Sequence, residues 1–172
     1  MMKIENKYLF FYKKGSPFSQ WFSCYFRIDN CDFNCTEQWM MYAKAVLFYD
    51  LEIAQQILET KEPIRQKELG RKVKNFDDVV WKQEAKTIVY KGNYEKFSQN
   101  KYLRDQLFAT ENKVMVEANP HDAIWGIGMS IDNPAIYDQK KWIGTNWLGE
   151  ILMQVRIDLL KEHERKTNKL LL

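Results

Sequence analysis

The 172-residue sequence predicts an α+β fold that is mainly helical. Short aromatic runs stand in its first 35 residues, segments with apolar residues at helical spacing follow them, and an amphipathic pattern lies near the end. Short strands followed by helices favour an α+β fold over a parallel sheet. Length and composition predict one domain over residues 1–172, with a core at about 8–160 and a tail at 161–172 that we expect to fray.

The strands are expected near the start of the chain. Tyr8–Tyr12 is aromatic and bounded by lysines and a glycine, so it predicts a buried strand. Ser16–Phe22 reads as a loop that carries exposed aromatic side chains. Tyr25–Ile28 and Asp32–Cys35 predict two further short strands around the turn Asp29-Asn30.

The first predicted helix, Glu37–Tyr49, carries two candidate catalytic residues. Thr36 is a good N-cap residue, and Glu37 falls in the first turn, where the helix dipole favours a negative charge. Glu37 and Lys44 are seven residues apart and share one helix face. Helix-dipole complementation and a solvated surface lysine remain the simpler explanations, but small alanines on both sides of Lys44 leave room for close approach.

Four more helical segments are expected before residue 110, the last of them a run that follows Asn100. One helix is expected to start after Asp50, which can cap it. Another is expected to start at Pro63 and to end near Gly70. Asp77 or Asp78 caps a longer helix with a stripe at Trp81, Ala85, Ile88 and Gly92. Because glycine inside a helix is unfavourable, Gly92 indicates either close packing or a helix break.

We expect the stretch Val114–Gly128 to form the centre of the functional site. Its apolar start predicts a strand, and Asn119-Pro120 predicts a turn. Asp122, Trp125 and the glycines Gly126 and Gly128 then fall within seven residues. A carboxylate, a flat ring and a backbone that allows close approach suit a pocket for a sugar and a base.

The last part of the chain predicts a loop and a long helix. Ser130–Trp142 looks like a flexible loop that could act as a lid. Asn146 stands at the start of the helix, where it either caps the helix or reaches a ligand, and Gly149 follows it. The apolar stripe of this helix is Leu148, Leu152, Val155 and Leu159.

Composition excludes several classes of function. The net charge of +3 permits a polyphosphate or nucleic-acid partner without indicating one. Three cysteines without paired C-x-x-C spacing argue against a disulfide framework and a zinc site, and two histidines make an imidazole metal centre improbable. No apolar run could form a signal peptide core or span a bilayer, so we expect a soluble cytoplasmic protein that does not bind membranes.

The motifs, taken in order, resemble the NADAR family, which includes the YbiA-like proteins. The matching segments are spread over nearly all of residues 8–160, with their order kept. They are Phe18–Phe22, Thr36–Ala45, Leu69–Arg71, Trp81, Lys91–Asn100, Val116–Gly128 and Asn146–Arg156. Each motif alone is weak, but their shared order makes the resemblance specific. It implies a YbiA-like fold, mainly helical with a small antiparallel β component.

The resemblance implies an N-glycosidase that cleaves a bond between ribose C1 and a nitrogen, without a metal or a cofactor. Its substrate would be an ADP-ribosyl or ribosyl-phosphate compound. ADP-ribosylated guanine in DNA or RNA is slightly favoured over a ribosylamino-pyrimidine phosphate of the riboflavin pathway, and the first choice implies functional pairing with a toxin ADP-ribosyltransferase. A non-catalytic module that binds ADP-ribose or related NAD-derived nucleotides is the alternative from another class.

The chemistry assigns roles to the candidate residues. Cleaving the ribosyl C–N bond builds positive charge on the sugar, which a carboxylate stabilises, and the leaving base needs an acid. Lys44 could form a Schiff base with an opened ribosylamine, as an alternative to direct hydrolysis. The predicted catalytic residues are Glu37, Lys44 and Asp122. The predicted substrate-binding residues are Phe18, Trp21, Gly70, Arg71, Trp81, Glu117, Trp125, Gly126, Asn146 and Gly149. All of this requires that Lys44 and Asp122 line one cleft.

Overall fold

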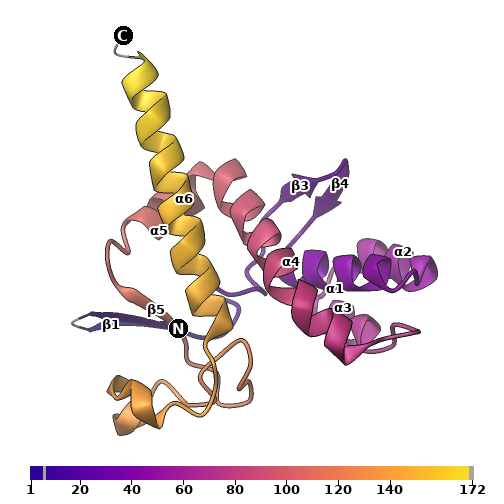
Figure 1. Cartoon of the computed structure of the whole chain (residues 1–172), viewed down its shortest axis with the longest axis horizontal. Helices are drawn as coiled ribbons and strands as arrows, with labels where there is room; N and C mark the ends of the chain where they lie inside the picture. Colours follow the sequence, from indigo (N-terminus) through magenta and orange to yellow (C-terminus); the bar gives the residue numbers. More distant parts are fainter. Residues whose placement is uncertain (6, 171–172) are drawn as a thin grey trace. The chain divides into compact units, whose positions relative to one another are not determined.

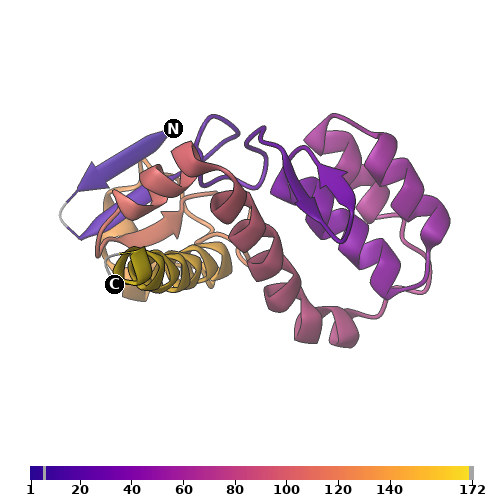
Figure 2. The same ribbon diagram turned by 90° about the horizontal axis from the view of Figure 1, so that it is seen from above.

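The computed structural model describes residues 1–5 and 7–170 of the chain. These residues form two compact units (Figures 1 and 2). Unit 1 consists of Met1–Ser19 with the chain from Lys101 onward, and unit 2 is Gln20–Asn100. Within the described ranges, no helix is long and apolar enough to cross a membrane.

Unit 1 contains a three-stranded sheet in the order β1-β2-β5. The strands are β1 (Met2–Glu5), β2 (Tyr8–Phe11) and β5 (Val114–Glu117). β2 and β5 were expected from the sequence, whereas β1 was not. β1 pairs with β2 in antiparallel fashion, and β2 pairs with β5 in parallel. The β component is therefore not wholly antiparallel, because β2 and β5 are far apart in the sequence and point the same way.

The core of unit 1 forms around β2, whose four residues are all buried. Its apolar cluster comprises Tyr8, Phe10, Val116, Ala118, Ile127, Met129, Ile131 and Ile136. The segment Ser130–Trp142 belongs to this cluster, which corrects the prediction of a flexible loop. It contains the 3₁₀ turns η1 (Pro134–Tyr137) and η2 (Gln139–Lys141). Ile136 is fully buried, and the Trp142 indole donates a 2.8 Å hydrogen bond to its carbonyl oxygen.

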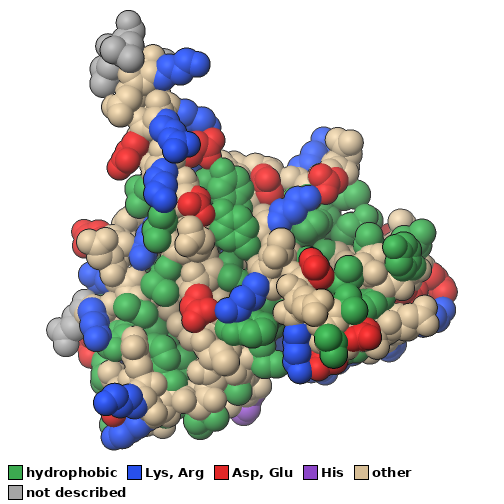
Figure 3. All heavy atoms as spheres, in the orientation of Figure 1, with side chains coloured by type: hydrophobic (Ala, Val, Ile, Leu, Met, Phe, Trp, Pro, Cys, Tyr) green, Lys and Arg blue, Asp and Glu red, His purple; other side chains and the backbone are tan. Residues whose placement is uncertain are grey.

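Two helices complete unit 1, namely α5 (Lys101–Phe108) and α6 (Trp147–Leu170). The predicted stripe of α6 is confirmed, since Leu148, Leu152, Val155 and Leu159 are all buried. The part of the predicted tail from residue 161 to Leu170 is helical and continues α6, and its fraying stays a prediction. Figure 3 shows charged side chains along these last turns of α6. Leu171 and Leu172 lie outside the described residues.

Unit 2 combines a hairpin with four helices. The hairpin consists of β3 (Phe26–Ile28) and β4 (Cys31–Phe33), as predicted. Its turn residues Asp29 and Asn30 have φ angles of 48° and 66°, in the left-handed region that Asp and Asn tolerate best. The helices are α1 (Thr36–Leu47), α2 (Leu51–Glu59), α3 (Pro63–Gly70) and α4 (Asp78–Gln99). Figure 2 shows the hairpin beside α1.

Three of the four helices in unit 2 start where the local sequence predicts, and one of these is α3, which begins at Pro63. The Asp50 carboxylate accepts from the Ile53 amide at 3.3 Å, and Asp77, rather than Asp78, accepts from two amides of α4. Thr36 is not the N-cap of α1. Cys35 occupies that position without a capping bond from its side chain, and the Thr36 hydroxyl donates to the carbonyl oxygen of Gln20 at 3.2 Å.

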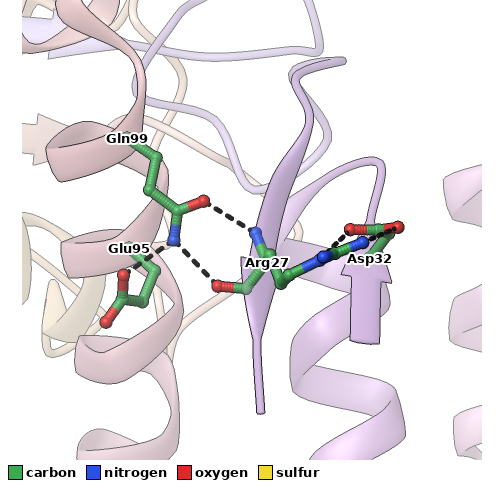
Figure 4. A network of polar contacts seen from close by, with 4 residues as sticks. All are labelled: Arg27, Asp32, Glu95 and Gln99. Atoms are coloured by element: carbon green, nitrogen blue, oxygen red, sulfur yellow. Dashed lines mark hydrogen bonds and ion pairs between the residues drawn. The ribbon is translucent and has the colours of Figure 1, made fainter. Parts of the chain in front are cut away.

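The Gln99 side chain fastens the hairpin to α4 (Figure 4). Its Oε1 accepts from the Arg27 amide and its Nε2 donates to the Arg27 carbonyl, each at 2.8 Å. Nε2 also donates to Glu95, and the Arg27 guanidinium forms an ion pair with Asp32. One side chain thus satisfies both backbone groups of a strand residue that would otherwise lack a neighbour on this side.

Gly92 is explained by close packing, since α4 continues unbroken through it. A Cβ atom built at Gly92 would lie 2.2 Å from Cδ1 of Trp39, whose indole nitrogen donates to the Ile88 carbonyl at 2.7 Å. We expect Gly92→Ala to lower the free energy of unfolding by about 1–3 kcal/mol, because this overpacking outweighs a helix-propensity gain of about 1 kcal/mol. Chemical denaturation measures this change.

The matched control is Gly15→Ala, because a Cβ at Gly15 has no atom within 4 Å. This variant is expected to stay within about 0.5 kcal/mol of the wild type. If Gly92→Ala were as stable as Gly15→Ala, the packing explanation for Gly92 would be wrong.

Candidate active site

Helix α1 positions both Glu37 and Lys44. Glu37 lies in its first turn, and its side chain is 3% exposed. The Glu37 amide donates to the Gln20 carbonyl at 3.0 Å, which anchors the start of the helix. Lys44 lies two turns further along, in the last turn, and is partly buried. The helical spacing that the sequence predicts for these two residues is therefore present.

The Lys44 ammonium group lies near two aromatic rings and donates to a carbonyl. Nζ donates to the Gly70 carbonyl oxygen at 2.9 Å. It lies 4.1 Å from the ring centroid of Phe76 and 5.7 Å from that of Trp81. Burial lowers the pKa of Lys44 below its usual value. A lysine held in this way is oriented, and it reaches the neutral, nucleophilic form at a lower pH than a solvated lysine.

Close packing of α3 against α1 makes the Gly70 contact available. A Cβ atom at Gly70 would lie 2.1 Å from the sulfur of Met41 on α1, so only glycine allows the two helices to approach this closely. Arg71 follows at the end of α3 and is exposed. Trp21, also in unit 2, is partly buried, with the Lys67 ammonium 5.9 Å from its ring centroid.

In unit 1, Asp122 shapes the turn that carries Trp125. Its Oδ1 accepts from the amides of Ile124 and Trp125 at 2.9 and 2.8 Å. Trp125 is partly buried and packs edge-on against Trp147, with ring centroids 5.7 Å apart. One oxygen of the predicted catalytic carboxylate is therefore bound by the turn that it orders.

Glu117 lies next to this turn. Its side chain is 8% exposed, and a Cβ atom at Gly126 would lie 3.2 Å from its Cγ. Burial, together with the negative charge of Asp122, raises the pKa of Glu117 to about 8. A carboxyl group with such a pKa is protonated at neutral pH and can donate a proton.

Glu117 should therefore make stability depend on pH. The native state keeps its proton up to about pH 8, whereas the ordinary pKa is 4.5, so its stabilising contribution is complete below pH 4.5 and is lost as the pH rises to about 8. We expect Glu117→Gln to remove this loss of stability. Above pH 8 the free energy of unfolding of the variant should exceed that of the wild type by on the order of 1–3 kcal/mol. Denaturation at a series of pH values measures it.

The control for this series is Glu164→Gln on the exposed face of α6, which should follow the wild type at every pH. Parallel curves for Glu117→Gln and the wild type between pH 4.5 and 9 would show that Glu117 titrates normally.

The structure gives Asn146 and Gly149 structural roles. Asn146 has a φ of 56°, and its side-chain amide accepts from the Glu117 amide at 3.0 Å and donates to the Met115 carbonyl at 2.9 Å. A Cβ atom at Gly149 would lie 2.1 Å from the same carbonyl oxygen. Both residues thus join the start of α6 to β5, and their predicted contact with a ligand stays a prediction. Phe18 is also buried, edge-on to Phe11.

The candidates fall into two groups. Unit 2 holds Trp21, Glu37, Lys44, Gly70, Arg71 and Trp81, and unit 1 holds Phe18, Glu117, Asp122, Trp125, Gly126, Asn146 and Gly149. Within unit 2 the structure brings Lys44, Gly70 and Trp81 into contact. Within unit 1 it brings Glu117, Asp122 and Gly126 together. That Lys44 and Asp122 share one cleft stays a prediction.

Sequence reasoning missed Phe76 and Lys96. Phe76 lies in the loop after α3, where no periodicity marks it. Lys96 is fully buried, and its Nζ lies 5.5 and 5.1 Å from the ring centroids of Phe22 and Phe97. Burial lowers the pKa of Lys96 to about 8. A signal existed, since Lys96 lies four residues after Gly92 and extends the buried stripe of α4. In the described ranges, no group of three His, Cys, Asp or Glu side chains could hold a metal ion.

Comparisons with known proteins show the family of the chain. A family model described as the NADAR domain matches residues 10–160. The chain is 38% identical over 162 residues to the protein named N-glycosidase R617 of Acanthamoeba polyphaga mimivirus, covering 88% of this chain and 95% of that protein. It is 44% identical over 139 residues to Protein irg-1 of Caenorhabditis elegans, covering 80% of this chain and 66% of that protein.

A further relative has a different description. The chain is 33% identical over 113 residues to the chloroplastic riboflavin biosynthesis protein PYRR of Zea mays, covering 63% of this chain and 16% of that protein. Among solved structures, the Escherichia coli protein YbiA matches with a TM-score of 0.75 at 24% identity, covering 94% of this chain and 89% of YbiA. This likeness confirms the predicted YbiA-like α+β fold.

Proposed function

Because the chain belongs to the NADAR family, we propose that it is an N-glycosidase that removes ADP-ribose from ADP-ribosylated guanine in nucleic acid. The observation that carries the proposal is the setting of Lys44, an oriented amine between two aromatic rings, on one helix with the buried carboxyl group of Glu37. The name of the viral relative, which the chain covers over 95% of its length, supports the reaction class.

The overall reaction is a hydrolysis. The bond between ribose C1 and the base nitrogen breaks, water supplies a hydroxyl group to C1, and the nitrogen leaves with a proton. Positive charge develops on C1 and the ring oxygen as this bond stretches. A buried carboxylate stabilises that charge more strongly than a solvated one, which is the role that we assign to Glu37.

Lys44 offers a covalent route to the same products. The ribosylamine opens to an imine at C1, with the ring oxygen taking a proton. The neutral Lys44 amine adds to C1 and the base amine leaves with the protons that Lys44 gives up, so that Lys44 is bound to C1 as an imine. Water then adds to C1, the Lys44 amine leaves, and the ring closes on the released ribose. The lowered pKa of Lys44 supports this route.

Two further carboxyl groups keep proposed roles. Glu117, with a pKa of about 8, suits the acid that protonates the leaving nitrogen near neutral pH. Asp122, which stays a candidate for stabilising the sugar, also raises the pKa of Glu117. Trp125 and Trp81 are proposed to stack on the base.

Basic and aromatic residues next to Lys44 favour a nucleic-acid substrate. Arg71 and Lys72 are exposed and directly follow Gly70, whose carbonyl holds Lys44. Phe76 is 43% exposed and lies under the Lys44 amine. Cations for phosphates next to a ring for a base are the usual elements of single-strand binding. With such a substrate, the natural partner would be a toxin ADP-ribosyltransferase whose modification this enzyme reverses.

The second candidate substrate is a ribosylamino-pyrimidine phosphate of riboflavin synthesis. The similarity to the maize riboflavin biosynthesis protein favours it, although that match spans only 16% of the maize protein. Both substrates contain a ribosyl C–N bond, so the same residues would serve either one.

The experiment compares both substrates directly. Purified protein is incubated with ADP-ribosylated single-stranded DNA and, separately, with the ribosylamino-pyrimidine phosphate, and the released sugar is measured by mass spectrometry. Release of ADP-ribose from DNA at the higher kcat/KM supports the proposal. Preference for the pyrimidine supports the second substrate, and tight binding of ADP-ribose without release from either compound would show a binding module.

A further inference from the structure

A cluster of buried polar side chains joins the start of α1 to α4. Gln20 is 8% exposed and Asn93 is fully buried. The carbonyl of Gln20 accepts from the Glu37 amide at 3.0 Å and from the Thr36 hydroxyl at 3.2 Å. The Nδ2 atom of Asn93 donates to Oε1 of Gln20 at 3.3 Å and to the Val89 carbonyl at 2.9 Å. The backbone of Gln20 is therefore bound to that of Glu37, and the side chain of Gln20 joins this point to Asn93 on α4.

One donor and one acceptor in this cluster have no partner. Nε2 of Gln20 and Oδ1 of Asn93 are buried and form no hydrogen bond with any residue in the ranges 1–5 and 7–170. Turning either amide over does not help. A reversed Asn93 would lose its bond to Val89, and a reversed Gln20 would set two N–H groups against each other. Each such buried group is costly unless something binds it.

Other buried amides of unit 2 are fully satisfied. Nε2 of Gln38 donates to three carbonyls of the chain around Ile57–Thr60, and its Oε1 accepts from the Asn34 amide. Nε2 of Gln66 donates to two oxygens, and its Oε1 accepts from Cys35 Sγ. Among the buried side-chain amides of unit 2 that the structure describes, incomplete bonding is thus confined to Gln20 and Asn93, which points to a ligand there.

We propose that Gln20 and Asn93 form a binding subsite for the vicinal 2- and 3-hydroxyl groups of a ribose. Nε2 of Gln20 donates to the oxygen of one hydroxyl, and the other hydroxyl donates to Oδ1 of Asn93. A diol matches one free donor and one free acceptor because each hydroxyl can both donate and accept. The sites on the two side chains are linked by a hydrogen bond, so adjacent hydroxyls of one sugar can reach both.

The neighbouring carboxyl group favours the sugar over the base as the occupant. This inference rests on the proposed function, in which Glu37 stabilises charge on ribose C1. The hydroxyls held beside Glu37 then belong to the ring that carries that charge, where their hydrogen bonds strengthen as the C–N bond breaks. Gln20 and Asn93 are accordingly positioning residues, and they select ribose over deoxyribose.

The experiment measures the binding of methyl ribofuranoside 5-phosphate and its 2-deoxy and 3-deoxy counterparts. These probes lack the aldehyde that could react with a lysine, and they contain no C–N bond to cleave. We expect wild-type protein to bind the ribose probe at least about tenfold more tightly than either deoxy probe, because each deoxy probe leaves a buried group unsatisfied. Gln20→Met and Asn93→Leu should bring these ratios close to one by weakening the ribose probe alone.

The matched control is Gln66→Leu, which removes a buried amide whose bonds are all made within the protein. It should lower thermal stability but keep the tenfold preference. If Asn93→Leu fails to fold, Gln20→Met decides the question. Each ratio compares the affinities of two probes for the same protein variant, so it does not depend on the other variant. Equal binding of all three probes by the wild type, or variants that weaken all probes equally, would mean that the cluster holds only water or serves the fold.

The outcome separates this subsite from the proposed function. Discrimination between probes that depends on Gln20 and Asn93, in a protein that cleaves no C–N bond, would keep the subsite and refute the enzyme. Cleavage of ADP-ribosylated DNA without any such discrimination would keep the enzyme and refute the subsite.

Discussion

Lys44→Met is expected to reduce kcat by at least about a thousandfold on the preferred substrate, because it removes the amine to which we assign the covalent intermediate. Methionine is close to lysine in length, so its side chain can keep the contact with Phe76. The fold should therefore survive, as thermal melting can verify. Single-turnover kinetics with saturating enzyme measure the chemical step directly.

Two further variants sharpen this result. Lys44→Arg keeps a positive charge over the rings of Phe76 and Trp81 but cannot form an imine, so it should be as inactive as Lys44→Met. Lys82→Met removes an exposed lysine that pairs with Asp78 and should leave kcat unchanged. Substantial activity in Lys44→Arg would reduce the role of Lys44 to electrostatics, and full activity in both Lys44 variants would remove it from the mechanism.

Glu37→Gln is expected to lower kcat by about 10²- to 10³-fold and to change ligand affinity little. The two side chains have nearly the same shape, and the charge that Glu37 stabilises exists only as the C–N bond breaks. Because the side chain is 3% exposed, water cannot replace the lost carboxylate. Comparing single-turnover rates with the dissociation constant of ADP-ribose separates the two effects.

The control for Glu37 is Glu62→Gln, an exposed residue just before α3, which should behave like the wild type. Equal losses of rate and of ADP-ribose affinity in Glu37→Gln would show that Glu37 positions the ligand instead of stabilising the transition state.

Local features of the fold were predictable from the sequence. The stripe of α6, the caps Asp50 and Asp77 and the hairpin turn at Asp29 each depend on residues within a few positions of one another. The parallel partner of β2 and the structured segment Ser130–Trp142 depend instead on contacts with distant parts of the chain. Thr36 looked like a cap but serves another bond, because Gln20 reaches the start of α1 from sixteen residues away.

The candidate site divides in the same way. Helical spacing alone placed Glu37 and Lys44 on one face of α1. Phe76 and the carbonyl of Gly70 could not be found this way, because α3 and its loop approach Lys44 through tertiary packing. For Asn146 the pattern left two readings open, because a polar residue at a helix start can bind a ligand or a neighbouring strand; the structure shows its bonds to β5, and its contact with a ligand stays a prediction.

The most direct test of the account is reductive trapping. ADP-ribosylated DNA and wild-type protein are mixed in the presence of borohydride, and the digested protein is analysed by mass spectrometry. The account predicts a reduced ribosyl adduct on the peptide that contains Lys44, and none in Lys44→Met. Turnover of the DNA without any adduct, or an adduct on another lysine such as the buried Lys96, would contradict it.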